Sequence, residues 1–169
     1  MKNKRSQNVF GMSFGVIFSI LLIIFFIVLA FIVIRSFLNI QDCAEVGLFI
    51  EGLEEDVDSA WNSQKFIDEI EYVLPGNLEY VCFANLSKSF RGGELEREIY
   101  NDIGVYQYAG ANLFFHPREN SCDISYYNLK HIDVNGITEL KNPYCFKIDD
   151  GKVNIEISKE LNEGLVGLG

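Results

Sequence analysis

The four cysteines carry the most evident chemistry in this chain. Cysteines in even number outside the cytoplasm usually pair, which predicts disulfides from Cys43, Cys82, Cys122 and Cys145. Three connectivities are possible, and pairing of sequence neighbours favours Cys43–Cys82 with Cys122–Cys145, although the spacing alone does not fix it. A zinc site of all four thiolates is the alternative, but the CxxC spacing typical of such sites is missing.

The remaining reactive residues form no pattern typical of an active site. His116 and His131 lack HxxxH or HExxH spacing, so we expect ordinary surface or core positions for both. The chain has no P-loop, GxSxG or GxGxxG motif, and residues 149–152 lack the spacing of an EF-hand and read as a turn. Oxidised cysteines disfavour a thiol nucleophile. We predict no catalytic residue, no cofactor and no metal site.

One further residue has a modification signature. The triplet Asn85-Leu86-Ser87 matches the N-glycosylation sequon, which is meaningful only in a domain exposed outside the cytoplasm. The sequence therefore predicts Asn85 as a glycosylation site, with chance occurrence of the triplet as the alternative.

The elements that would position these residues begin with a long apolar run. Residues 9–34 contain no charge, and 26 residues of helix would span roughly 39 Å, more than the roughly 30 Å hydrocarbon core of a bilayer. The run is longer than the apolar region of a secretory signal peptide, and no small-residue cleavage site precedes Arg35. We predict a single transmembrane helix, with the lipid bilayer as its partner.

Charge predicts the orientation of this helix. Residues 1–8 carry Lys2, Lys4 and Arg5 and no acid, which favours a cytoplasmic N-terminus, while Arg35 opposes it weakly. After residue 34 the chain has 11 basic and 24 acidic residues, a net charge of −13. Such a surface repels nucleic acid and anionic lipid headgroups, so we expect an extracytoplasmic domain that binds neither.

A second helical pattern follows the apolar run. An apolar stripe recurs at three- and four-residue spacing and predicts one buried face, formed by Val46, Ile50, Leu53, Val57, Ala60 and Trp61. The other side is acidic and reads as a solvated face, formed by Glu51, Glu54, Glu55 and Asp58. Either Asp42 caps a separate helix, or the membrane helix continues through residues 36–42.

The rest of the chain reads mainly as strands. Residues 79–84, 112–116, 124–134, 144–148 and 152–158 are predicted strands, and 94–103 is a predicted short helix. Asn135-Gly136 and residues 149–151 are typical of hairpin turns. Because Val153, Ile155 and Ile157 alternate with polar residues, the last strand should bury one face.

These elements predict an α+β fold. It consists of a long N-terminal helix, first transmembrane and then amphipathic, followed by an antiparallel sheet of four or five strands that the amphipathic helix covers. The expected divisions are a basic N-terminus at 1–8, a membrane helix at 9–34, a helical extension at 35–63 and a β-rich domain at 64–169, which folds together with 41–63.

The membrane helix also has a feature that favours contact with another helix. Gly11, Gly15 and Ser19 are spaced four residues apart and share one helical face, and Gly11 to Gly15 is a GxxxG motif. Small residues let helices approach closely in lipid, so we predict self-association through this face. The alternative is that these residues are simply common in membrane helices.

The N-terminus carries a resemblance to a known family. Lys4-Arg5-Ser6-Gln7 followed by the apolar run resembles the class III signal of archaeal type IV pilin-like proteins. The resemblance implies cleavage between Ser6 and Gln7 on the cytoplasmic side, with the apolar helix left attached to a β-rich head. Gly11 stands at the fifth mature position, where many bacterial pilins have glutamate and archaellin-like members often do not. The start of the chain is also similar to that of small archaeal membrane-anchored proteins.

Three functional readings follow from the sequence. The first is a structural subunit of a pilin-like surface assembly. The second is a monomeric surface protein whose acidic head binds a partner, ligand or cell envelope, with an exposed aromatic patch formed by Tyr106, Tyr108, Phe114 and Phe115. An exterior enzyme is the least favoured reading, since no set of convergent catalytic residues is evident.

Overall fold

The computed structural model describes residues 14–122 and 124–169, and the chain divides into two compact units. One unit ends at Ile40 and the other, called the head here, is Gln41–Gly169. The basic N-terminus, the predicted cleavage site Ser6-Gln7 and Gly11 lie outside the described residues.

Helix α1, Phe14–Asn62, contributes to both units. Neither glycine nor proline occurs between Val16 and Val46, so nothing in the backbone chemistry ends the helix there. The helix therefore continues through residues 36–42, and Asp42 lies inside it instead of capping a separate helix.

Within the head, α1 supplies one side of the hydrophobic core. Its buried residues recur at three- and four-residue spacing: Val46, Phe49, Ile50, Leu53, Val57 and Ala60. All but Phe49 belong to the predicted stripe, whereas Trp61, the last residue of that stripe, remains exposed at 39%.

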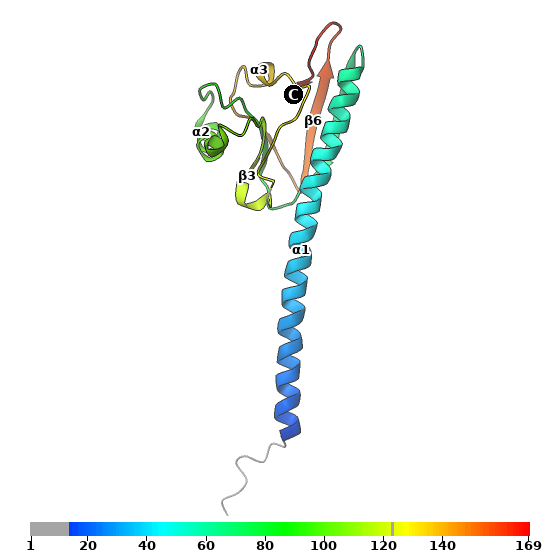
Figure 1. Ribbon diagram of the computed structural model, residues 1–169, viewed down its shortest axis with the longest axis vertical. Helices are drawn as coiled ribbons and strands as arrows, with labels where there is room; N and C mark the ends of the chain where they lie inside the picture. Colours follow the sequence, from blue (N-terminus) through cyan, green and yellow to red (C-terminus); the bar gives the residue numbers. More distant parts are fainter. Residues whose placement is uncertain (1–13, 123) are drawn as a thin grey trace, which may run out of the picture. The chain divides into compact units, whose positions relative to one another are not determined.

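The first sheet of the head has the order β1-β6-β7. Strands β1 (Phe66–Val73) and β6 (Lys152–Lys159) pair antiparallel over eight residues, and β7 (Gly167–Leu168) adds a short strand on the other side of β6. Every second residue of β6 is buried, as its alternation predicts. Figure 1 shows the head part of α1 beside β6.

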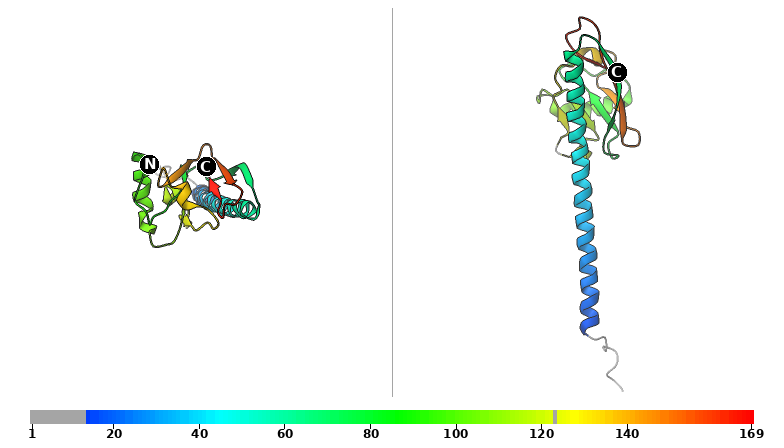
Figure 2. Two further views of the ribbon diagram at one scale, coloured as in Figure 1. Left: turned by 90° about the horizontal axis from the view of Figure 1, so that it is seen from above. Right: turned by 90° about the vertical axis from the view of Figure 1, so that its right-hand side faces the viewer.

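The second sheet has the order β4-β3-β2-β5, with all neighbours antiparallel. Its strands are β2 (Tyr80–Phe83), β3 (Leu113–His116), β4 (Tyr126–Tyr127) and β5 (Tyr144–Lys147). Between β2 and β3 the chain forms α2 (Glu94–Ile103) and the 3-10 turn η1 (Gly104–Tyr106). Figure 1 places α2 and β6 on opposite sides of β3, and the view from above in Figure 2 also separates them.

Two clusters of buried side chains hold these elements together. The larger one joins α1 to both sheets and includes Leu53, Val81, Phe115 and Ile155. The smaller one lies under α2, where Ile99 and Ile103 pack on the second sheet. The α+β class with a long N-terminal helix and an antiparallel β-region is confirmed, with the strands of the described residues divided between two sheets instead of one.

Two local expectations differ from the structure. Residues 124–134 form only the two-residue strand β4, and Asn135-Gly136 lies within the short helix α3 (Val134–Ile137) instead of a hairpin turn. The Asp133 carboxylate accepts a hydrogen bond from the Gly136 amide at 3.0 Å, which caps this helix.

The turn after β5 forms as expected but connects two different sheets. Asp149 and Lys152 pair across it, and Asp150 and Gly151 both have positive φ, as a two-residue type I′ turn requires. Strand β5 then belongs to the second sheet and β6 to the first.

Candidate functional site

The apolar part of α1 is the most distinctive surface of the chain. Its large side chains from Val16 to Ile40 are between 39% and 67% exposed. Among the described residues, one helix is long and apolar enough to cross a membrane, it lies near the N-terminus, and its most apolar stretch has no buried residue. Among the described residues of the first unit, none covers this surface, which is apolar enough to fit lipid or another apolar helix.

The small-residue face is described only in part. The hydroxyl of Ser19 donates a hydrogen bond to the carbonyl of Gly15 at 2.7 Å, so its polar group is satisfied within the helix. Any contribution of Gly15 and Ser19 to helix association would therefore come from close packing.

All four cysteines form disulfides, but the pairing favoured by the sequence is wrong. The bonds join Cys43 to Cys122 and Cys82 to Cys145. Cys82 and Cys145 are register partners on the neighbouring strands β2 and β5, with Cα atoms 4.0 Å apart. Strand pairing thus brings Cys82 next to Cys145. The cysteines nearest to them in the sequence, Cys43 and Cys122, lie on other elements and pair with each other.

The disulfide between Cys43 and Cys122 fixes the head part of α1 to the rest of the head. Cys43 lies on α1, and Cys122 lies 79 residues later, between β3 and β4. Their Cα atoms are 5.6 Å apart. A cross-link over so long a loop restricts the unfolded chain strongly.

Acidic residues of α1, among them Glu54 of the side predicted to be solvated, bind other elements of the head. The Tyr72 hydroxyl donates to the Asp56 carboxylate at 2.6 Å, and the Tyr127 hydroxyl donates to Glu54 at 2.9 Å. Burial, followed by the hydrogen bond to Asp56, raises the pKa of Tyr72. The hydrogen bond to Glu54, followed by burial, raises the pKa of Tyr127.

A histidine and the single tryptophan meet at the C-terminal end of α1. The rings of Trp61 and His131 are stacked with centroids 3.8 Å apart, and His131 Nδ1 lies 2.8 Å from Asp58 Oδ1. The Trp61 indole donates to the Gly164 carbonyl at 3.1 Å. These contacts explain His131 as a packing residue that joins a loop to the helix.

Lysine 159 completes this end of the helix. Its side chain is buried, and Lys159 Nζ donates to the carbonyls of Trp61 and, at 2.8 Å, of Ser63. A cation at the C-terminal carbonyls of a helix is favourable for the helix dipole. Sequence reasoning missed Lys159, Tyr72 and Tyr127 because their partners are distant in the chain.

The other histidine, His116, connects β3 to α2. Its Nδ1 lies 3.4 Å from an oxygen of Asp102, and Arg118 Nε lies 3.2 Å from the other oxygen. Among the described residues, no group of three His, Cys, Asp or Glu is placed to hold a metal ion. We therefore interpret His116 as part of a structural ion-pair cluster.

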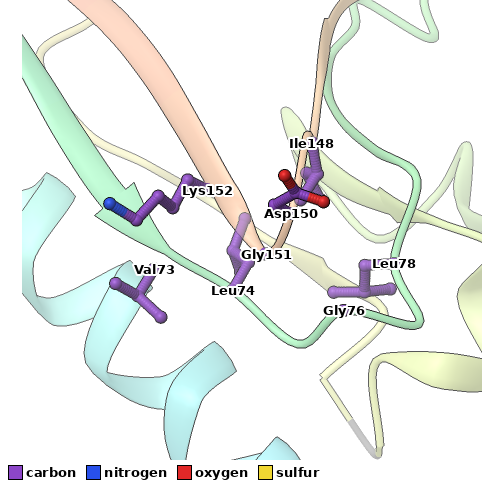
Figure 3. Close-up of a pocket in the computed structure, with 8 residues that line it drawn as sticks. All are labelled: Val73, Leu74, Gly76, Leu78, Ile148, Asp150, Gly151 and Lys152. Atoms are coloured by element: carbon purple, nitrogen blue, oxygen red, sulfur yellow. The ribbon is translucent and has the colours of Figure 1, made fainter.

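An open pocket of about 490 Å³ lies where β1 ends and β6 begins. Its lining combines apolar side chains and polar atoms, with Asp150 and Lys152 as the charged residues (Figure 3). Figure 3 shows their charged groups pointing in different directions, and Lys152 Nζ pairs with Glu71 at 2.7 Å. The two groups do not converge on a common point, so this pocket lacks the polar constellation of a binding site.

The sequon residue Asn85 is partly buried, and its side chain forms two hydrogen bonds. Its amide group donates to Asn135 at 2.9 Å, and its carbonyl oxygen accepts from the Ser87 backbone amide at 3.0 Å. One amide hydrogen of Asn85 is therefore occupied by a neighbouring side chain. Glycosylation of Asn85 stays a prediction.

The exposed aromatic patch expected from the sequence is formed by only part of the predicted residues. Phe114 and Phe115 are fully buried in the core, so their inclusion was wrong. Tyr108 is 92% exposed, and Tyr126 is exposed with its ring centroid 4.6 Å from that of Tyr106. Phe114 and Phe115 point to opposite faces of the second sheet, and both faces are covered, since Phe115 belongs to the larger buried cluster and Phe114 packs with α2 in the smaller one.

Comparison of the chain with protein-family models, curated proteins and solved structures finds no match. The functional interpretation therefore depends on the residues and contacts described above.

Proposed function

We propose that this protein is a non-enzymatic, membrane-anchored subunit of a pilin-like surface assembly, with its N-terminus in the cytoplasm and its head outside. The observation that carries the proposal is the change along α1. The same helix exposes apolar side chains all around up to Ile40 and then buries one stripe in the head.

An exposed apolar helix is stable only where water is excluded. The bilayer provides one such place, and the core of a bundle formed by copies of the same helix provides another. A subunit whose helix moves from the bilayer into the core of such a bundle can be stored in the membrane and later assembled. Gly11, Gly15 and Ser19 would permit the close helix contacts of the assembled state.

The head supports an extracytoplasmic location. Its two disulfides persist in oxidising compartments, and its excess of acidic residues keeps crowded heads soluble. The three cationic residues before the apolar run favour the opposite side for the N-terminus.

The N-terminus of the mature protein tests the proposal most directly. Mass spectrometry of the protein purified from its own membranes should find a chain that begins at Gln7. An intact chain that begins at Met1 or Lys2 would reject the class III signal and, with it, the pilin-like assignment.

Self-association tests the helix face separately. Replacement of both glycines by isoleucine, Gly11→Ile/Gly15→Ile, should weaken self-association in detergent. The matched control, Met12→Ile/Val16→Ile, has the same spacing on a neighbouring face and should leave it unchanged. Equal association of both variants and the wild type would contradict packing through this face.

The alternative function is a monomeric surface protein that binds a partner through its head. The exposed Tyr108 beside the loop that carries Tyr106 favours this reading. It predicts an unprocessed N-terminus and a monomer in native membranes, so the same two measurements separate the functions.

A further inference from the structure

Strand β1 forms a long and uncovered edge of the first sheet. It is the end strand in the order β1-β6-β7, and within the described residues it pairs with β6 alone. It has eight residues, whereas the other end strands of the two sheets, β4, β5 and β7, have two or four. Its outward backbone groups are therefore available over a length that could accept another strand.

Several features that normally block strand addition are missing from β1. The strand contains no proline and no lysine, and its register with β6 is continuous, without a bulge. Its charges are all negative, from Asp68, Glu69 and Glu71. Antiparallel pairing of two copies of β1 about Glu69 or Ile70 would place Glu69 opposite the Glu69 or Glu71 of the other copy, and like charges in that position are destabilising.

The solvent-facing side of β1 has a regular pattern. Ile67, Glu69, Glu71 and Val73 alternate with residues of which Phe66, Ile70 and Tyr72 pack on the core, and the side chains of Ile67 and Val73 are both 57% exposed. Along the strand this side therefore reads apolar, acidic, acidic, apolar.

The centre of this surface has an unbalanced charge. Glu69 is the register partner of Glu156 on β6, so two carboxylates lie side by side. Among the described residues, neither side chain forms an ion pair, whereas the nearby Glu71 binds Lys152 at 2.7 Å. A cation placed next to Glu69 on the open side of β1 would relieve this repulsion.

We propose that the open edge of β1 binds an extended basic segment of a partner protein, which adds to the sheet as a further strand. The segment reads apolar, basic, basic, apolar at alternate positions, so that its cations face Glu69 and Glu71 and its apolar residues face Ile67 and Val73. Backbone hydrogen bonds supply affinity, and the alternate side chains supply selectivity. This inference does not depend on filament assembly.

The probe is a labelled peptide, TVTKTKTIT, and the protein is the full chain in neutral detergent micelles. Fluorescence anisotropy should show binding of this peptide and at least about tenfold weaker binding of the acidic peptide TVTETETIT. A third peptide has the basic sequence with every backbone amide N-methylated. It keeps the charge but cannot donate backbone hydrogen bonds, so it should also bind at least about tenfold more weakly.

Two charge-reversal variants locate the site. Glu69→Lys should weaken binding of the basic peptide and strengthen binding of the acidic one. Glu98→Lys, which makes the same change at an exposed position on α2, should keep the wild-type preference. The variant at Glu69 gains an attractive contact with Glu156, so its fold should be retained, and thermal unfolding checks this.

Three results would overturn the proposal. Absence of binding by the basic peptide would exclude the site. If the N-methylated peptide bound as tightly as the unmodified basic peptide, backbone hydrogen bonding would be excluded, and non-specific attraction between the basic peptide and the acidic head would explain the binding. Equal effects of Glu69→Lys and Glu98→Lys would exclude β1 as the location.

Discussion

The two parts of α1 both carry large apolar side chains, but these side chains have different surroundings. In the first unit, Phe25 and Ile27 are exposed on different sides of the helix, at 55% and 60%. In the head, Leu53 and Val57 are fully buried on one side. A helix that is apolar all around needs a partner outside its own unit, whereas a striped helix finds its partner in the head.

The polar residues of the helix follow the same division. No ionisable residue occurs between Val16 and Ile34, so that part has no side-chain ion pair to offer. In the head, Glu54, Asp56 and Asp58 each bind a side chain from another element. The head part of α1 is thus specified by its apolar stripe and by contacts on both flanks of that stripe.

Among the tests of this comparison, removal of the disulfide between Cys43 on α1 and Cys122 should have the largest effect on the stability of the head. Cys43→Ser/Cys122→Ser should lower the free energy of unfolding of the head by about 4 kcal/mol, since the bond closes a long loop of the unfolded chain. Guanidinium unfolding followed by Trp61 fluorescence measures this.

The same variant checks the connectivity. Cys82 and Cys145 should remain bonded, so thiol titration of the denatured variant should find no free thiol. Two free thiols would contradict this connectivity, because Cys82 and Cys145 lose their partners in both of the other possible pairings.

Paired leucine substitutions should separate the buried and exposed sides of the helix. Leu53→Ala should cost about 3 kcal/mol of head stability, through lost burial and the cavity that remains. Leu48→Ala, on the same helix but 66% exposed, should change it by less than about 0.5 kcal/mol. Leu29→Ala in the first unit should leave head unfolding unchanged. Similar losses for Leu48 and Leu53 would contradict the one-sided core.

Tyrosine 72 should give a smaller effect with a defined pH dependence. Tyr72→Phe should cost about 1 kcal/mol by leaving Asp56 without its donor. Because the pKa of Tyr72 is raised in the folded state, its stabilisation is complete below the unfolded pKa of about 10 and decreases as the pH rises above it.

Unfolding measured at increasing alkaline pH should therefore show a steeper loss in the wild type than in Tyr72→Phe. The control is Tyr108→Phe, whose side chain is 92% exposed. It should keep both the stability and the alkaline slope of the wild type. An unchanged slope in Tyr72→Phe would mean that the buried hydroxyl is not coupled to folding.

Local patterns predicted much of the fold. The bounds of α2 agree with the sequence prediction, three of the predicted strands contain β2, β3 and β5, and a fourth covers all but the last residue of β6. These segments have regular periodicity and clear turn signals at their ends. Strand β1 was missed because Asp68, Glu69 and Glu71 interrupt its apolar alternation, which gives it the composition of a loop.

The contacts between distant residues could not be predicted in this way. The disulfide pairs depend on which strands become neighbours, and the acidic side of α1 looked solvated because its partners lie up to 73 residues away. Asn135-Gly136 predicted a hairpin turn, but the two residues lie in helix α3, whose N-terminus is capped by Asp133. Aspartate is a residue type that does favour a helix start. Local chemistry predicted the elements, and their pairing required the three-dimensional structure.

The most subtle test concerns the acidic side of α1. Asp58→Asn should cost about 0.5 kcal/mol, because the pair with His131 is partly exposed and such pairs contribute little. The stacked Trp61 should nevertheless report the change as altered fluorescence, since His131 loses its charged anchor. Glu55→Gln, on an exposed position of the same helix, should change neither quantity. If both variants behave alike, the acidic side of α1 is a solvated face after all, and the apolar stripe alone distinguishes the head part of the helix from the part before Gln41.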